Sequence, residues 1–457
     1  MTRACLPAPI LLLVLGLTAA ASSAGCAAGT AEEPPPASIV VPARPAEADW
    51  ARIRTRRIQT FLLPAMQKTG IDMWLVMARG DNNDPLAKFV GGEHAIGDAV
   101  YIFSVDGTTL RRTAIVPLGD STPVRESGEF DEVLTFVGGG LAEHLAATVK
   151  RIDPSRIGIN MSGKAVLDGI SATQKAMLER VLGAPYASRL KPAEPVVVEY
   201  LNRKLPEEVK ILREAARLTD LIEREAYATV EPGRTTDLEL AERVRARVRE
   251  LGLGFSWDEG QNPNVTSGLD RGHSPAANRV IQPGDIIMMD FGIRLWDHWV
   301  TDVQRFAYVL KPGEQAAPAD AQHQWEAARD ANRAALAAMR PGTRGVDVDR
   351  AQMAVGKARG CLDPIWSTGH PVGYWAHDVG PTLGGSRAAT PPEAARRPLE
   401  PWMTFSFDGF CCVEREDVGV SGMKCISVEE MAVVTDRGAE YLVAPQEELI
   451  LIRSGTR

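Results

Sequence analysis

Several acidic residues lie inside apolar segments, where solvation cannot explain a charge. Asp290 follows the run IIMM, Asp302 precedes VQRFAYVL, Asp408 lies within FSFDGF, and Glu429 and Glu430 lie within KCISVEEMAVV. A buried carboxylate is costly unless it is paired or bound to a metal. One acidic residue in a strand is more often an edge or turn residue, but the repetition predicts a shared cation site. Because side chains alternate along a strand, only one of the two Glu can face that site.

Histidine is scarce, with seven in the chain, so the grouping of these residues is informative. His370 and His377 lie close together in the Gly- and Pro-rich segment STGHPVGYWAHDVGP. His273 lies in another loop-like segment, SGLDRGHSP, upstream of Asp290. A neutral imidazole combined with several carboxylates suits a pair of divalent metal ions.

These side chains together predict a dinuclear metal centre. The predicted metal ligands are Asp290, Asp302, His370, Asp408 and Glu429. Their four carboxylates balance the charge of two divalent ions. Ligation rich in oxygen and free of thiolate favours Mn²⁺, with Co, Zn and Fe as alternatives.

A predicted hairpin positions the first two carboxylates. The strand-like run IIMMDFG turns through IRLWDH and returns as WVTDVQRFAYVL. If the hairpin centres near Trp296, Asp290 and Asp302 lie directly opposite each other and share a face.

Two predicted helix pairs precede the acidic strands. Pro206 opens a helix that extends to about residue 230, and Thr236 with Glu239 forms a capping box for a second helix that stops near Gly252. The same plan recurs in DAQHQWEAARDANRAALAAM and RPGTRGVDVDRAQMAVGKARG. The two halves therefore look duplicated, although chance similarity of helix punctuation is the alternative.

The first half of the chain has a different pattern. Over residues 49–190, the strand-like runs IDMWLVMAR, AVYIFSV, RTAIVPL and RIGIN alternate with the helix-like stretches ARIRTRRIQTFLLPAMQKTG and KAVLDGISATQKAMLERVLG. This predicts an α/β domain without a nucleotide-binding glycine motif. Residues 191–200, KPAEPVVVEY, are the predicted linker, and residues 201–452 form the predicted catalytic domain.

The N-terminus predicts export. Residues 1–26 are the predicted signal peptide, because the apolar run ILLLVLGLTAAA is too short to span a bilayer and ends in small residues. Ser23-Ala24-Gly25-Cys26 resembles a bacterial lipobox, in which Cys26 becomes lipidated. Cleavage at an Ala-rich site with Cys26 incidental is the alternative. Residues 27–48 are a predicted disordered spacer, and we expect a periplasmic or cell-envelope protein, with its only membrane attachment through Cys26.

Composition limits the partners. The 457 residues are 45% hydrophobic and carry a formal net charge of −8, without a basic block, which disfavours nucleic acid and predicts two packed cores. Four cysteines lie in the body of the chain: Cys361, Cys411, Cys412 and Cys425. We expect one of the adjacent pair to bridge to Cys425 or Cys361 in an oxidising compartment, with buried free thiols as the alternative.

The order of the acidic and histidine residues resembles the pita-bread metallopeptidases, which include aminopeptidase P, prolidase and methionine aminopeptidase. The motifs are MMDFG, TDVQR, GHPVGYWAHDVGP and SVEEMAVVT. The region before them resembles the creatinase-type N-terminal domain. The resemblance implies an α/β (α+β) chain in which a creatinase-like α/β domain is followed by a pita-bread domain with duplicated halves.

The resemblance also implies residue roles. Asp290 binds one metal, Asp302 and Glu429 bridge both, and His370 and Asp408 complete the ligand shell. His273, His377 and Asp408 are the implied catalytic residues. His377 hydrogen-bonds the substrate or the tetrahedral intermediate, His273 matches the family's other active-site histidine, and Asp408 transfers a proton. The implied activity is hydrolysis of a short peptide at an N-terminal Xaa-Pro bond by a homodimeric enzyme.

Three residues depart from the family pattern. The family has Glu where this chain has Asp408, usually has His where Trp366 stands, and often has Arg where Ser427 stands. The last two positions shape the proline subsite, so metal chemistry is better supported than proline specificity. The alternatives are a non-peptidase hydrolase or lyase on the same fold, or a non-catalytic envelope binding protein.

Overall fold

The computed structural model describes residues 38–268, 271–272, 274–414 and 422–453. The predicted signal peptide and Cys26 lie outside these residues. Within the described part of the chain, none of the helices has the length and apolar character needed to cross a membrane.

The N-terminal domain is built on one mixed sheet of six strands, in the order β4-β3-β2-β1-β5-β6. The strands are β1 (Met73–Ala78), β2 (Ala99–Asp106), β3 (Thr109–Pro117), β4 (Glu132–Phe136), β5 (Ile157–Ile159) and β6 (Leu190–Pro192). The helices are α1 (Trp50–Arg57), α2 (Leu63–Thr69), α3 (Ser121–Glu126), α4 (Leu141–Ile152) and α5 (Ala172–Tyr186). The four predicted strands correspond to β1, β2, β3 and β5, so this domain is α/β as predicted.

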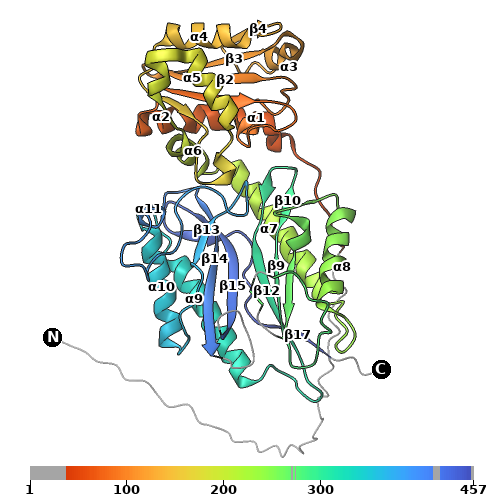
Figure 1. Cartoon of the computed structure of the whole chain (residues 1–457). Coiled ribbons are helices and arrows are strands. Elements are labelled where there is room, and N and C mark those ends of the chain that lie inside the picture. The colour runs from red at the N-terminus through yellow and green to blue at the C-terminus, as the bar shows by residue number, and fades with distance from the viewer. Residues whose placement is uncertain (1–37, 269–270, 273, 415–421, 454–457) are drawn as a thin grey trace, which may run out of the picture. The chain divides into compact units, whose positions relative to one another are not determined.

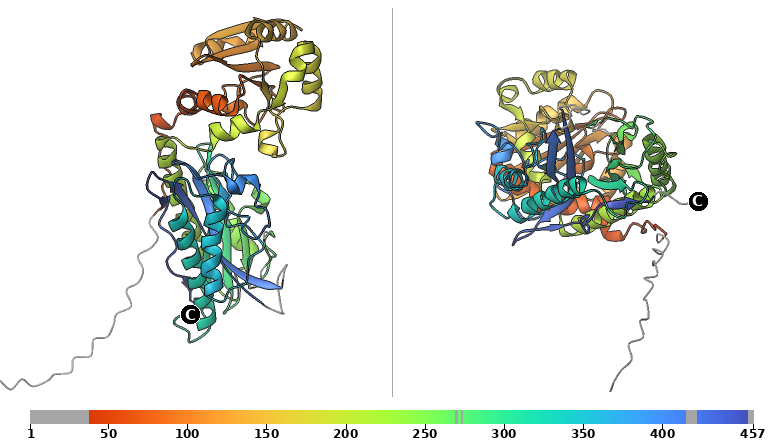
Figure 2. Two further views of the ribbon diagram at one scale, coloured as in Figure 1. Left: turned by 90° about the vertical axis from the view of Figure 1, so that its left-hand side faces the viewer. Right: turned by 90° about the horizontal axis from the view of Figure 1, so that it is seen from below.

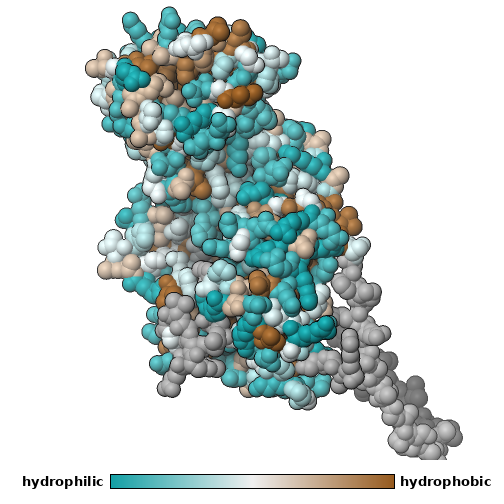
Figure 3. Space-filling model, turned by 45° about the vertical axis from the view of Figure 1, so that its right-hand side comes forward, coloured by the Kyte–Doolittle hydropathy of each residue, from teal (hydrophilic) through white to brown (hydrophobic). Residues whose placement is uncertain are grey.

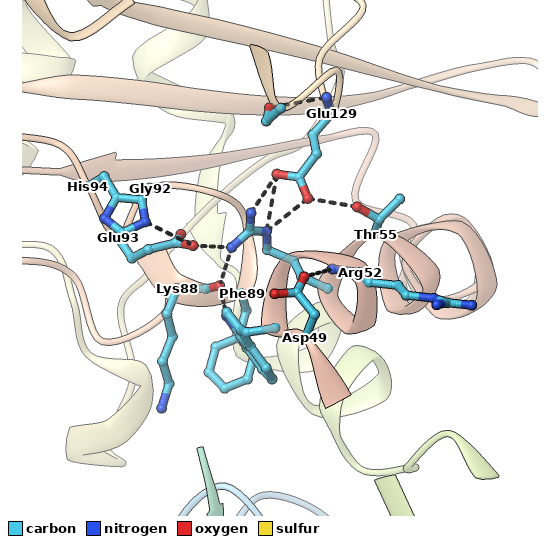
Figure 4. Close-up of polar contacts among 12 residues, drawn as sticks. Asp49, Arg52, Thr55, Lys88, Phe89, Gly92, Glu93, His94 and Glu129 are labelled. Atoms are coloured by element: carbon cyan, nitrogen blue, oxygen red, sulfur yellow. Dashed lines mark hydrogen bonds and ion pairs between the residues drawn. The ribbon is translucent and has the colours of Figure 1, made fainter. Parts of the chain in front are cut away.

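A buried ionic cluster fixes α1 within this domain (Figure 4). Arg54 donates to Glu129 through Nη2 at 2.7 Å and also pairs with Glu93. Thr55 Oγ1 donates to the same Glu129 carboxylate at 2.7 Å. Because Glu93 and Glu129 belong to the segments before β2 and β4, α1 is tied to two distant parts of the domain.

Two predicted boundaries are wrong. Within the predicted spacer 27–48, Ile39 and Ala48 are buried in the core, so the part of the spacer that the structure describes contributes to the packed domain. The predicted linker 191–200 is mostly helix α6 (Glu194–Leu201). Proline does not interrupt it, because Pro195 lies in the first turn, where a missing N–H costs nothing. The valines that follow are buried.

The C-terminal domain contains two four-stranded sheets and a small three-stranded one, in the orders β17-β12-β9-β8, β13-β14-β15-β16 and β11-β10-β7. The first contains β8 (Asn264–Ser267), β9 (Ile286–Phe291), β12 (Val303–Val309) and β17 (Ile450–Ile452). The second contains β13 (Gly369–Pro371), β14 (Thr404–Glu414), β15 (Met423–Val434) and β16 (Ala439–Tyr441). The third contains β7 (Gly254–Phe255), β10 (Ile293–Leu295) and β11 (Trp299–Val300).

Helices cover the outer sides of these sheets. They are α7 (Pro206–Tyr227), α8 (Asp237–Glu250), α9 (Ala319–Ala338), α10 (Gly345–Ala358) and the short α11 (Glu393–Arg396). In Figures 1 and 2, α7 lies beside β9 and β12, and α9 lies beside β14 and β15; α8 packs on β8, and α10 packs on β14. The central strands therefore face each other between two helical layers.

The predicted helix pairs are confirmed. Thr236 caps α8 by accepting from the backbone N–H of Glu239, whose side chain accepts from the Thr236 backbone N–H. Gly252 follows with φ 67°, as a helix-terminating glycine should. The helix α7 ends at Tyr227, slightly before the predicted end at residue 230. The pairs α7–α8 and α9–α10 each precede a four-stranded sheet, as expected for duplicated halves.

Composition predicted two separate hydrophobic cores, but the observed core continues from one domain into the other. The largest cluster of buried side chains includes residues from both the N-terminal and the C-terminal domain. A buried ion pair crosses the same boundary, because Arg57 of α1 donates to Glu208 of α7 at 2.7 Å. On the face drawn in Figure 3, hydrophilic residues predominate and hydrophobic residues form scattered patches.

Candidate active site

Four strands bring the predicted acidic residues into one cluster. Asp290 lies on β9, Asp302 immediately precedes β12, Asp408 lies on β14, and Glu429 lies on β15. Carboxylate oxygens of Asp290, Asp302 and Glu429 lie within 4.8 Å of one another. All three residues are buried, with 4% to 7% of their surface exposed. The two halves of the domain therefore contribute to one site.

The predicted pairing of Asp290 with Asp302 is wrong by two residues. Asp290 pairs with Gln304, and Asp302 is its diagonal neighbour. The hairpin centres on Asp297, one residue after the predicted position, because β10 and β11 pair through a three-residue turn. The chain can pack closely at Gly292, where a Cβ would lie 2.0 Å from a backbone oxygen. Diagonal neighbours on one face remain within reach of each other, so the carboxylates still meet.

The two histidines of the Gly- and Pro-rich segment lie beside this cluster. His370 Nε2 is 3.7 Å from Asp302 Oδ2, and the rings of His370 and His377 are 4.2 Å apart. His370 Nδ1 lies 3.2 Å from the backbone oxygen of Pro371; donation to that oxygen leaves Nε2 as the ligand atom. Burial, assisted by His377, lowers the pKa of His370 to about 3. Predicted residue His273 lies outside the described residues.

The burial and the negative charges of the cluster favour a bound cation. Burial and the neighbouring carboxylates raise the pKa of Asp290, Asp302 and Asp408 well above the usual range. Burial raises the pKa of Glu429 to about 7. Asp290 Oδ1 and Asp408 Oδ1 are buried without a hydrogen-bond donor. Crowded carboxylates with undonated oxygens, beside a neutral imidazole, fit divalent metal ions with oxygen-rich ligation.

Two polar residues that the sequence analysis did not identify, Ser406 and Gln304, support the acids together with Ser427. Ser406 Oγ lies 2.8 Å from Glu429 Oε1 and 2.6 Å from the backbone oxygen of Asp302. Ser427 donates to Gln304 Oε1 at 2.6 Å, and Gln304 in turn hydrogen-bonds Glu429. Strand alternation could have found them, because Ser406, Ser427 and Gln304 each lie two residues from a predicted ligand and share its face.

The second Glu of the pair faces away from the site, as alternation predicts. Glu430 Oε1 is 3.1 Å from Arg305 Nη1, and Arg305 Nε donates to Asp220 on α7 at 2.8 Å. Arg305 and Glu430 are fully buried. This ion cluster joins β12, β15 and α7 directly behind the strands that carry Asp302 and Glu429.

The four body cysteines form two disulfides rather than the single one predicted. Cys361 is bonded to Cys411, and Cys412 is bonded to Cys425. The first bridge ties the segment before the histidine motif to β14. The second ties β14 to β15.

A cavity of about 390 Å³ opens beside the cluster. Its lining includes the residues of the predicted ligand set, namely Asp290, Asp302, His370, Asp408 and Glu429, together with His377. A bound molecule in this cavity therefore has direct access to the acids and histidines.

Comparisons with known proteins agree with this arrangement. Residues 210–436 match the Peptidase_M24 family, described as metallopeptidase family M24. The uncharacterized peptidase YqhT of Bacillus subtilis is 24% identical over 317 residues, which cover 69% of this chain and 80% of that protein.

Solved structures share the fold over nearly the whole chain. An Xaa-Pro dipeptidase from Bacillus anthracis superposes with a TM-score of 0.66 at 20% identity, covering 88% of this chain and all of that one (100%). The dipeptidase PepE from Mycobacterium ulcerans superposes with a TM-score of 0.66 at 21% identity, covering 90% of this chain and 100% of that one. The predicted fold class is thereby confirmed.

Proposed function

The chain belongs to metallopeptidase family M24 through residues 210–436, and we propose that it hydrolyses short peptides at an N-terminal Xaa-Pro bond with the help of two divalent metal ions. The observation that carries this proposal is the convergence of acids from both halves of the domain on one cavity. The similarity in fold to an Xaa-Pro dipeptidase supports the choice of bond.

Two overlapping sets of side chains would hold the metals. Asp290, Asp302 and Glu429 form one set, and Asp302, His370, Asp408 and Glu429 form the other. Divalent ions at these positions supply an activated water and polarise the scissile carbonyl. We take Mn²⁺ as the resident metal because carboxylates dominate the set, with Co, Zn and Fe as alternatives.

The remaining steps belong to the side chains. Asp408 Oδ1, which has no hydrogen-bond donor, accepts a proton from the attacking water and returns it to the leaving nitrogen. His377 lies against His370 at the cavity, where its ring hydrogen-bonds the substrate carbonyl. Ser406 and Gln304 orient Glu429 by hydrogen bonding to its carboxylate, as outer partners of metal ligands do.

A metal-depletion experiment tests the proposal. Protein stripped of metal is expected to regain hydrolysis of Xaa-Pro dipeptides and tripeptides when Mn²⁺ is added, whereas the variant His370→Ala is not. His323→Ala is the matched control, because His323 is an exposed histidine on α9 that contacts the backbone of Arg359. Metal-replete protein that cleaves no member of an Xaa-Pro panel contradicts the proposal. Cleavage of a small non-peptide amide, or a lyase reaction, in its place selects the alternative chemistry.

We also propose that the enzyme is exported and anchored in the cell envelope through Cys26. The two disulfides support this proposal, since such bonds persist in oxidising compartments. Fractionation of cells that produce the full chain tests it: the wild type is expected with the membranes, and Cys26→Ser as a soluble exported protein. Recovery of the wild type in the cytoplasm contradicts export.

A homodimer is proposed from the resemblance to aminopeptidase P and prolidase. Light scattering on the purified protein is expected to give twice the mass of the chain. A monomeric mass over a range of concentrations contradicts it.

A further inference from the structure

The side chains that line the cavity change from acidic to apolar along the strands. At one end lie the acids. Two and four residues away along the same strand faces, the lining side chains become mainly apolar. This second end, which we call the apolar end, is lined by Ile286, Met288, Phe306, Trp366, Phe410 and Cys425.

Strand geometry places the apolar end one substrate residue away from the acids. On β9, Met288 and Ile286 share the face of Asp290, and on β14, Phe410 shares the face of Asp408. Because a strand rises roughly 3.3 Å per residue, steps of two and four residues correspond to about 7 and about 13 Å. A large side chain next to the scissile bond reaches the nearer part of this range when that bond lies at the acids.

Trp366 closes one side of the apolar end. Its ring stacks on Phe410 with centroids 6.2 Å apart and an interplanar angle of 16°. Phe410 is almost fully buried, at 3% exposed, whereas Trp366 is half-buried and faces the cavity. The pair forms a flat aromatic wall.

The position of Trp366 is fixed by the chain around it. The backbone N–H of Leu362 donates to Cys412 O at 2.8 Å, beside the disulfide that joins Cys361 to Cys411. Arg387 donates to the backbone oxygen of Trp366 at 3.0 Å. A wall held in this way is in place before a substrate arrives, which lowers the cost of binding.

We propose that the apolar end is a subsite for a large aliphatic or aromatic side chain flanking the scissile bond, with Trp366 as its specificity-determining residue. This inference rests on the proposed peptidase function and narrows its substrate class. A small or polar side chain leaves the apolar wall in contact with water, whereas a large apolar one removes it. In hydrophobic pockets such differences amount to roughly 10- to 200-fold in kcat/KM.

Two series of dipeptides test the proposal: Xaa-Pro, with Xaa varied among Gly, Ala, Leu and Phe, and Ala-Yaa, with Yaa varied among Pro, Gly, Ala, Leu and Phe. With Mn²⁺-loaded wild type, Leu or Phe is expected to exceed Ala in kcat/KM by about tenfold or more at one of the two positions. In Trp366→Ala this ratio is expected to fall about tenfold, and Trp366→Phe is expected to restore most of it. Trp402→Ala is the matched control, because Trp402 is 39% exposed and does not line the cavity; its ratio is expected to equal that of the wild type.

Two results overturn the subsite: equal kcat/KM for Ala, Leu and Phe at both positions, or a uniform loss for every substrate in Trp366→Ala. Failure of the proposed function is a separate result, namely no hydrolysis of any peptide. In that case the subsite is tested by calorimetry, which compares the affinities of L-phenylalanine and L-alanine for the Mn²⁺-loaded protein. Tighter binding of L-phenylalanine that Trp366→Ala abolishes supports the subsite, and equal binding overturns it.

Discussion

Asp408 on β14 is paired directly with Glu429 on β15 across an antiparallel hairpin. Residues paired in this way point to the same face and come within about 5 Å at their Cβ atoms. Glu429 is buried and Asp408 is half-buried, and desolvation together with the charge of Glu429 raises the pKa of Asp408. The pair is therefore unfavourable as two free anions and favourable as two ligands of a cation, which gives a physical reason for metal binding at this hairpin.

Among the predicted metal ligands, Asp408 is the one that differs from the residue usual in the family. Asp408→Asn is expected to lower kcat by about 10²- to 10⁴-fold, because it removes the proposed proton acceptor, and to lower metal content from two ions towards one. Asp408→Glu, which restores the family residue, is expected to retain both metals. Elemental analysis together with steady-state kinetics measures both effects. Unchanged metal content and kcat in Asp408→Asn contradict the assigned role.

The stability of the metal-free protein is expected to fall as pH rises through neutrality. Burial raises the pKa of Glu429 and Glu430 to about 7 from 4.5. An acid whose pKa is raised by folding stabilises the protein below its unfolded pKa, and this contribution is lost as pH rises through the folded value. The window therefore runs from about pH 4.5 to above pH 7.

Thermal unfolding in the presence of a chelator checks this pH dependence. The variant Glu429→Gln removes one of the titrations, so its unfolding temperature is expected to depend less on pH than that of the wild type. Added Mn²⁺ is expected to reverse the trend in the wild type, because metal binding requires deprotonated carboxylates and strengthens as pH rises. A variant with a steeper pH dependence than the wild type contradicts the expected effect.

The ion cluster behind the metal site is expected to contribute to stability. Arg305→Met leaves Glu430 and Asp220 without their buried partner, which costs about 3 to 5 kcal/mol in free energy of unfolding. Arg333→Met is the matched control, because Arg333 is 43% exposed and pairs with the exposed Glu447; its cost is expected to be below about 1 kcal/mol. Denaturant titrations measure both, and equal losses contradict the assignment.

The disulfide beside Trp366 is expected to affect substrate choice. Replacing both Cys361 and Cys411 by Ala removes the covalent link between β14 and the segment that carries Trp366. We expect the ratio of kcat/KM between Leu and Ala substrates to fall several-fold while metal content is retained, because the metal ligands remain in place. Elemental analysis and substrate panels measure the two quantities, and loss of metal without a change in the ratio contradicts this expectation.

Much of the fold follows from local sequence signals. Capping residues at Thr236 and Glu239 and the apolar runs of β1, β2, β3 and β5 identify their elements because each signal is contained in a short segment. Strand β4 was missed because all of its residues are half-buried and show no alternation. The predicted helix over residues 164–183 begins only at Ala172, after its cap Ser171.

The sequence identified most of the residues of the site, but it did not predict their strand register or the pairing of the cysteines. Acids in apolar strands identified the cluster, but the register of Asp290 depends on a turn through Trp296 and Asp297, both with positive φ. Turns of this kind usually carry Gly or Asn, and neither is present, so the sequence contains no marker of the centre. Cysteine pairing is likewise not encoded locally, since four cysteines allow three connectivities.

The neighbouring cysteines of β14 also affect the unfolded chain. Cys361–Cys411 and Cys412–Cys425 close two consecutive loops, with sequence separations of 50 and 13. By the chain-entropy relation these closures destabilise the unfolded state by about 4 and about 3 kcal/mol. His370 on β13 and Asp408 on the neighbouring strand β14 both lie within the longer loop, so these two residues stay inside one closed loop when the rest of the chain unfolds. The bridges thereby limit how far the two predicted metal ligands can separate in a denatured molecule.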